Sequence, residues 1–200
     1  MTLETHASDY GIALAADTVD RLVTYYELLS AWNQRLHLVA PTTPQEFATR
    51  HILESLLLLE HLPEDARVAD VGSGAGLPII PCLIARPDLQ ALLIESTQKK
   101  AVFLREALSQ TGTLAGTTVV ADRFENTGTP DVGFVTCRAL ERFEKMVPQL
   151  VEWAPDQAVF LFFGGEGLGK SLEGLEFTAH LIPNSQKRFL YVSRSQNRKP

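Results

Sequence analysis

The segment DVGSGAG, from Asp70 to Gly76, constrains the fold of this chain more than any other feature. It overlaps the short β-compatible run Val68–Val71, so an acid and three alternate glycines lead into the next element. Glycines let the backbone approach a ligand at the carboxyl end of a first strand, where doubly wound sheets bind their ligands. The loop therefore predicts an α/β sheet with a ligand site at this edge. Glycines that simply form a tight turn are the alternative.

The glycine spacing also separates classes of ligand. The dinucleotide fingerprint places its third glycine one residue later than Gly76, and the Lys-Ser/Thr pair of a P-loop is absent. An NAD-dependent oxidoreductase is therefore disfavoured. Glu95 ends a second apolar run, 91–94, about twenty residues after the loop, where a carboxylate can accept both hydroxyls of a ribose. This pattern is typical of nucleoside binding, with a solvated acid at a strand end as the alternative.

The rest of the chain alternates between strand and helix patterns. We predict helices over 77–85, 99–108 and 142–153, and further strands over 117–121, 132–137, 158–163, 176–181 and 188–192. Such alternation predicts a parallel sheet with helices on both faces.

An amphipathic helix is predicted from Thr18 to Leu38, and a capping-box pattern at Thr43 and Glu46 begins a second helix that ends before Pro63. We expect a helical part over residues 1–64, packed as one unit on a ligand-binding core over 65–200.

Composition places the chain among soluble globular domains, with 45% hydrophobic and 21% charged residues. No leader pattern and no apolar run near the roughly 20 residues of a membrane span is visible, so we expect a cytoplasmic protein without a membrane contact. We also expect a monomer. Cys82 and Cys137 match no zinc spacing, so no metal is expected. The net charge of −6 argues against extensive phosphate contacts but leaves room for a local basic face.

Several further segments carry a resemblance to a known family. They are Trp32-Asn33, Arg50 to Leu56, Asp70 to Pro78 with Pro81, 85–87, Glu95-Ser96 with Lys99, 103–105, Arg123 with Glu125, and Arg138-Ala139. Together they resemble the RsmG (GidB) family of class I S-adenosylmethionine-dependent methyltransferases, which methylate N7 of a guanine in the decoding region of 16S rRNA. The resemblance implies a Rossmann-like sheet, mostly parallel with a C-terminal antiparallel strand. It also implies that 16S rRNA or the small ribosomal subunit is the partner.

The pattern and the resemblance nominate site residues. The loop spacing nominates Asp70, Gly74 and Gly76 as cofactor-binding residues, and the resemblance adds Gly72, Leu77, Phe124, Glu125 and Arg138, with Glu95 on the ribose. Arg138 and His51 are expected to position the reactants without a general base, since guanine N7 carries a lone pair and no proton. RNA contacts are expected from Arg50, Lys99, Lys100, Arg123 and Arg142.

One departure from the family pattern affects the substrate side. The fifth strand of the family commonly ends in Lys-Gly, whereas this chain has Phe163-Gly164. A catalytically inactive nucleotide- or RNA-binding module of the same fold is therefore the alternative to an enzyme.

Overall fold

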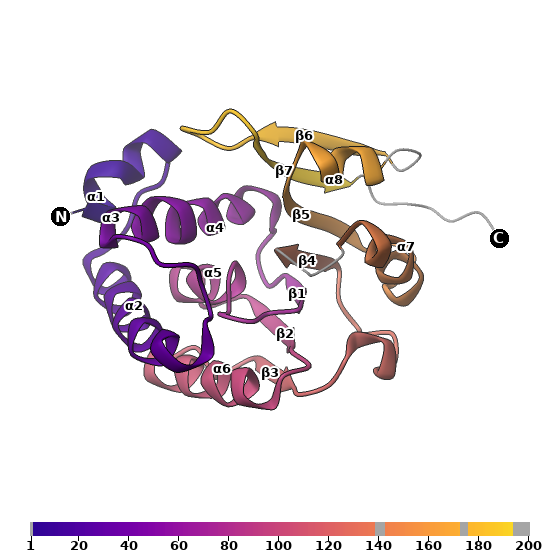
Figure 1. The fold of residues 1–200 in the computed structure, drawn as a ribbon, viewed down its shortest axis with the longest axis horizontal. Coiled ribbons are helices and arrows are strands. Elements are labelled where there is room, and N and C mark those ends of the chain that lie inside the picture. Colours follow the sequence, from indigo (N-terminus) through magenta and orange to yellow (C-terminus); the bar gives the residue numbers. More distant parts are fainter. Residues whose placement is uncertain (1, 139–142, 173–175, 194–200) are drawn as a thin grey trace.

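The protein is a seven-stranded sheet with helices on both faces, as seen in a computed structural model that describes residues 2–138, 143–172 and 176–193. The strands lie in the order β3-β2-β1-β4-β5-β7-β6, from one edge to the other in Figure 1. Their bounds are β1 Arg67–Val71, β2 Gln90–Ile94, β3 Thr117–Val120, β4 Phe134–Arg138, β5 Val159–Gly165, β6 Phe177–Leu181 and β7 Arg188–Ser193.

The first five strands are parallel, and β7 is antiparallel to both of its neighbours, β5 and β6. The predicted mostly parallel sheet with a C-terminal antiparallel strand is confirmed. β1 lies between β2 and β4, so β2 and β3 are added on one side of it and β4 and β5 on the other. The strand order therefore reverses at β1. Open α/β sheets bind ligands at such a switch point, beyond the carboxyl ends of the strands.

The helices occupy both faces of the sheet. Their bounds are α1 Thr2–Ala7, η1 Ser8–Tyr10, α2 Ala16–Leu36, α3 Pro44–Phe47, η2 Ala48–Leu53, α4 Glu54–Leu56, η3 Leu57–His61, α5 Ile79–Ala85, α6 Gln98–Gln110, η4 Phe124–Asn126, α7 Phe143–Trp153 and α8 Glu166–Ser171. Helices α1 and α8 were not predicted. The helix expected over 77–85 begins only at Ile79, because residues 74–78 form turns.

The predicted second helix is one helical segment that changes its winding. Thr43 caps α3 as a complete capping box, since its side chain accepts from the Glu46 amide while the Glu46 carboxylate accepts from the Thr43 amide. The segment then continues through the π-helical η2, α4 and the 3-10 helix η3. π-Helical turns are rare and frequently occur at functional sites. This one contains Arg50 and His51.

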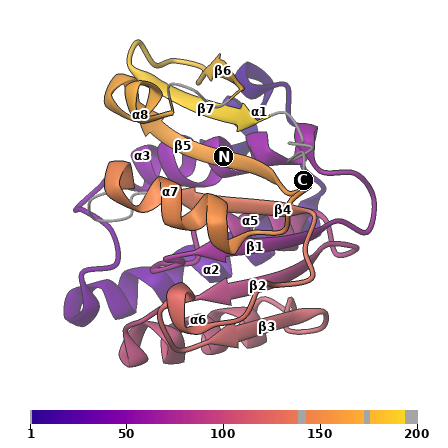
Figure 2. The same ribbon diagram turned by 90° about the vertical axis from the view of Figure 1, so that its right-hand side faces the viewer.

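Two apolar clusters hold the helices against the sheet. One joins Leu22 of α2, Leu53 of η2 and Leu104 of α6 to one face, and the other joins Leu150 of α7 and Leu168 of α8 to the opposite face. Figure 2 shows α7 and α2 on opposite sides of the sheet. The first cluster contains residues from both sides of position 64, although the division of the chain at that position stays a prediction.

Candidate functional site

The glycine loop ties the carboxyl ends of β1 and β2 together. The amides of Gly72 and Ser73 both donate to the carbonyl of Ile94, at 2.9 and 3.1 Å. Gly74 has a φ of +51°, and a Cβ built there would have no neighbour nearer than the Gly72 carbonyl at 3.7 Å. An added Cβ would therefore meet no close neighbour at Gly74, so the backbone here leaves room for a ligand. The close approach of a ligand to this backbone stays a prediction.

Glu95 lies directly against this loop. Its side chain is 6% exposed, and its two carboxylate oxygens accept from the amide of Gly74 at 2.9 Å and from the amide of Thr97 at 2.7 Å. Each carboxylate oxygen has a second lone pair, so these contacts orient the group and leave it able to accept further donors. The ribose contact predicted for Glu95 stays a prediction, on a carboxylate that the loop and the start of α6 already hold in place.

Two adjoining hollows lie at this edge of the sheet. The Glu95 hollow, of about 560 Å³, is lined by His51, Gly72, Gly74, Leu77, Glu95, Lys100 and Arg138 among others. The Phe124 hollow, of about 550 Å³, is lined by Gly72, Ser96, Asp122, Arg123, Phe124, Glu125 and Lys145 among others. Gly72 and Ser96 line both hollows, so together they form a long, mostly polar-rimmed site across the switch point.

Asp70 and Gly76 lie beneath the loop and line neither hollow. Asp70 has no exposed surface, and neither of its carboxylate oxygens has a hydrogen-bond partner among the described residues. Burial raises the pKa of this carboxyl to about 8. At Gly76, where φ is +82°, an added Cβ would lie 2.3 Å from Cδ1 of Ile80. Both residues are thus on the buried side of the glycine segment, and their predicted cofactor contacts stay predictions.

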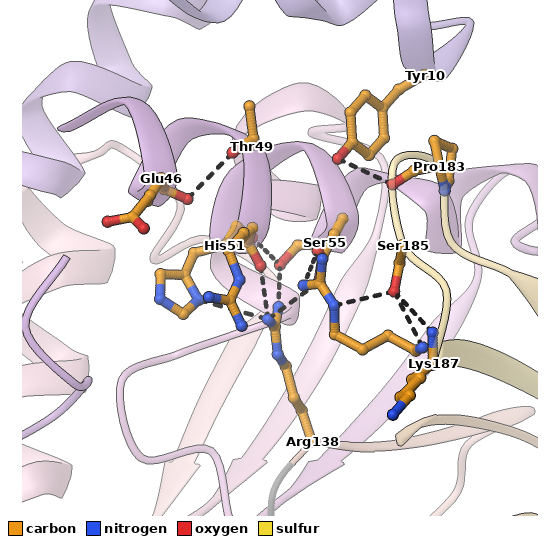
Figure 3. A network of polar contacts seen from close by, with 12 residues as sticks. Tyr10, Glu46, Thr49, His51, Ser55, Arg138, Pro183, Ser185 and Lys187 are labelled. Atoms are coloured by element: carbon orange, nitrogen blue, oxygen red, sulfur yellow. Dashed lines mark hydrogen bonds and ion pairs between the residues drawn. The ribbon is translucent and has the colours of Figure 1, made fainter. Parts of the chain in front are cut away.

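Arg138, at the end of β4, reaches across to the helical segment, as Figure 3 shows. Its guanidinium donates to the Arg50 carbonyl at 2.6 Å and to the Glu54 carboxylate at 3.3 Å. The other Glu54 oxygen accepts from Arg188 of β7, and the Glu54 side chain is 2% exposed. Arg138 also lies over the ring of Phe163, 5.5 Å from its centroid. Phe163 thus packs beneath the arginine, where the family pattern has a lysine.

His51 lines the Glu95 hollow and contacts the same arginine. Its Nδ1 lies 3.4 Å from Nη2 of Arg138, and its ring packs on Phe47 with centroids 5.1 Å apart. Burial, assisted by the charges of Arg138 and Arg50, lowers the pKa of His51 to about 4. The imidazole is therefore neutral near pH 7. With Nδ1 accepting from Arg138, the ring proton is on Nε2.

The predicted RNA-binding residues are spread around the site. Lys100 lines the Glu95 hollow and Arg123 the Phe124 hollow, whereas Lys99 lines a third hollow between α2 and α6. Arg50 is exposed, and Arg142 lies outside the described residues.

Sequence reasoning missed Glu54 and Arg188. Glu54 belongs to the Arg50–Leu56 segment that carries the family resemblance. An acid among the leucines of an amphipathic helix is the sequence signal that could have identified this residue.

Within the described part of the chain, no cluster of three or more His, Cys, Asp or Glu side chains could hold a metal ion. Both cysteines are buried and unbridged. None of the described helices combines the length and the hydropathy that a transmembrane span requires.

The chain is similar to known proteins over most of its length. The family model GidB, described as rRNA small subunit methyltransferase G, matches residues 18–198. Two relatives named ribosomal RNA small subunit methyltransferase G are similar over most of their lengths. The one from Sorangium cellulosum is 39% identical over 163 residues, which are 78% of this chain and 68% of the relative. The one from Nitrosomonas europaea is 40% identical over 160 residues, which are 76% of this chain and 74% of the relative.

Solved structures share the fold at low sequence identity. An RNA methyltransferase from Salinibacter ruber, in complex with S-adenosyl-L-homocysteine, has a TM-score of 0.61 and 15% identity, covering 80% of this chain and 97% of its own. A SAM-dependent methyltransferase from Aquifex aeolicus has a TM-score of 0.61 and 17% identity. The match covers 82% of this chain and 97% of that protein. The likeness of these two structures is one of fold.

Proposed function

This chain belongs to the rRNA small subunit methyltransferase G family, and from that premise we propose that it transfers a methyl group from S-adenosylmethionine to N7 of a guanine in 16S rRNA. The observation that carries the proposal is the pair of adjoining hollows at the glycine loop. They contain most of the residues that the family resemblance nominates. The alternative of an inactive binding module is not favoured, because the relatives are named as methyltransferases.

The residues present fit adenosylmethionine, a molecule with an adenosine part and an amino-acid part. We assign the adenine to the Phe124 hollow, where Phe124 offers an apolar ring and Glu125 a carboxylate. Glu95 is suited to the ribose hydroxyls, and Gly72, Gly74 and Leu77 to the remainder. When bound, the cofactor supplies an electrophilic methyl group on a positively charged sulfur.

The protein residues in this proposal orient the reactants and transfer no proton. Guanine N7 attacks with its own lone pair, so alignment matters more than basicity. His51 is neutral with its proton on Nε2, so a residue that lines the Glu95 hollow carries a hydrogen-bond donor. Arg138 is fixed by the Arg50 carbonyl, Glu54 and the Phe163 ring. A guanidinium held in this way can bind a phosphate or the cofactor but cannot act as a base.

The test is single-turnover methyl transfer to small ribosomal subunits that lack the modification, followed from pH 6 to pH 8. We expect a flat rate for the wild-type protein, because His51 does not titrate in this range. The Arg138→Ala variant is expected to be slow at every pH. A wild-type rate that rises about tenfold per pH unit would reveal a general base and refute the mechanism. Full activity of Arg138→Ala would remove that residue from the site.

The proposed substrate also sets the expected location and partner. Since 16S rRNA is found in cytoplasmic ribosomes, we place the protein in the cytoplasm and expect it to act as a monomer. Comparing methyl transfer to naked 16S rRNA with transfer to assembled small subunits identifies which form is the substrate. Mapping the modified base tests the N7 assignment.

A further inference from the structure

A third hollow lies apart from the two at the glycine loop, between the C-terminal end of α2 and the N-terminal half of α6. We call it the α2–α6 groove; it is lined by Trp32, Arg35 and Leu36 of α2 and by Lys99 and Val102 of α6, with two further α2 residues. Its volume is about 640 Å³. The two helices lie side by side at the lower left of Figure 1, with α6 next to the edge strand β3.

The groove combines apolar surface with positive charge. Trp32 is only partly covered, although its ring packs on Phe103 with centroids 5.8 Å apart, and Val102 is 51% exposed. The side chains of Arg35 and Lys99 form no hydrogen bond or ion pair with another residue that the structure describes. No acidic residue is among the lining residues, although the whole chain has a net charge of −6. Uncompensated cations beside an aromatic ring are the features that bind single-stranded nucleic acid.

The groove is next to the methyl-transfer site. Leu36 lines the groove while Leu38, two residues later, lines the Glu95 hollow. On α6, Lys99 lines the groove while the adjacent Lys100 lines the Glu95 hollow. Neighbouring positions on a helix point about 100° apart, so these two lysines mark two sides of one ridge. An RNA strand that passes Lys100 at the Glu95 hollow can therefore continue over this ridge into the groove.

From these observations we propose that the α2–α6 groove binds a single-stranded segment of the rRNA substrate next to the target nucleotide. Arg35 and Lys99 contact its phosphates, and a base of the segment stacks against Trp32. This inference rests on the proposed function, since it names the surface that holds the substrate of the same site.

The first test measures the affinity of the protein for a 16S rRNA transcript as a function of salt concentration. Each phosphate contact on a single strand contributes about 0.7 to the slope of log affinity against log salt. We expect Arg35→Gln and Lys99→Gln each to weaken binding and to lower this slope by about that amount. Arg105→Gln is the matched control, because Arg105 is an exposed cation on α6 that does not line the groove. It is expected to leave the slope unchanged.

The second test addresses the aromatic contact. Trp32→Leu keeps an apolar side chain against Phe103 but removes the stacking surface. We expect it to weaken rRNA binding at least about fivefold, the lower end for losing a base–aromatic contact. Affinity for S-adenosylmethionine, measured by calorimetry on the same samples, is expected to stay at the wild-type value for all the groove variants. In methyl transfer, KM for the RNA should rise while the single-turnover rate at saturation is kept.

Three outcomes would overturn the proposal. If the groove variants match Arg105→Gln in affinity and slope while the wild-type protein methylates its RNA, the groove lies off the RNA path. If they change the oligomeric state in sedimentation, the groove is a surface for a second copy of the chain. If the wild-type protein neither binds nor methylates 16S rRNA, the proposed function fails, and the inference fails with it.

Discussion

Asp70 gives the sharpest quantitative prediction, because a buried carboxyl without a partner must respond to pH. Burial raises its pKa from 3.8 to about 8. Between these values the folded protein keeps a proton that the unfolded chain has released. The free energy of unfolding therefore falls as pH rises, by about 1.4 kcal/mol for each pH unit. The contribution that neutral Asp70 makes to the free energy of unfolding is fully present below about pH 4. It is lost progressively as pH rises to about 8.

The perturbation is Asp70→Asn, which keeps the shape of the side chain and removes its ionisation. At acidic pH both proteins carry a neutral group at this position, so their difference in stability reflects only the packing and desolvation of an amide. From pH 4.5 to pH 7.5 the wild-type protein loses stability through Asp70 while the variant does not. We expect the stability of the variant relative to wild type to increase by about 4 kcal/mol over these three pH units.

Urea denaturation of both proteins at pH 4.5 and pH 7.5, without cofactor, measures this difference. Titration of all other groups is common to the two proteins and cancels. Asp20→Asn, an exposed position on α2, reports the effect of the same substitution outside the core. A difference between wild type and Asp70→Asn that changes by less than about 1 kcal/mol would show that Asp70 ionises alike in both states, and would refute the reasoning.

Three further predictions concern the loop and the arginine network. Gly76→Ala places a Cβ against Ile80 at a positive φ, so we expect it to cost about 2 to 4 kcal/mol in urea denaturation; a loss below about 1 kcal/mol would contradict the geometry. Glu95→Gln is expected to weaken S-adenosylmethionine binding by about 1.5 to 3 kcal/mol in calorimetry, and a loss below about twofold would count against the ribose contact. Glu54→Gln leaves Arg138 without its carboxylate and is expected to destabilise the protein by about 3 to 5 kcal/mol, whereas unchanged stability would show that the pair contributes little.

The strands and the loop were predictable because their signals are local. An apolar run, alternate glycines and an acid at the end of the next run all lie between Val68 and Glu95, and the sheet brings them together as expected. Helix α8 was not predictable in this way. It has six residues, and Gly167 and Gly169 give it a poor helix propensity. Packing of Leu168 in the core supports it, and sequence periodicity does not show such packing.

The role of Asp70 illustrates a second limit. Its place at the head of the glycine loop predicts a contact with the ligand, and that contact stays a prediction. The complete burial of the residue was not predicted. The structure places it in β1 with both neighbouring strands paired, at no exposure. Whether a residue of a strand is buried depends on the helices that pack on the sheet, and these come from elsewhere in the chain. The pattern of residues along β1 does not contain that information.

The arginine network shows why the site depends on parts of the chain far from the loop. Arg138 ends β4, Glu54 belongs to the helical segment, and Arg188 begins β7, 134 residues after Glu54. The predicted division at residue 64 separates Glu54 from the two arginines that it binds. Burial raises the pKa of Glu54, while the charges of Arg138 and Arg188 oppose that rise and favour the carboxylate. Because burial in turn lowers the pKa of Arg138, each charge is held in the core by the other. The N-terminal helices and the C-terminal hairpin are therefore parts of the structure that positions Arg138 at the Glu95 hollow. A core of residues 65–200 alone would present that arginine without the carboxylate that orients it.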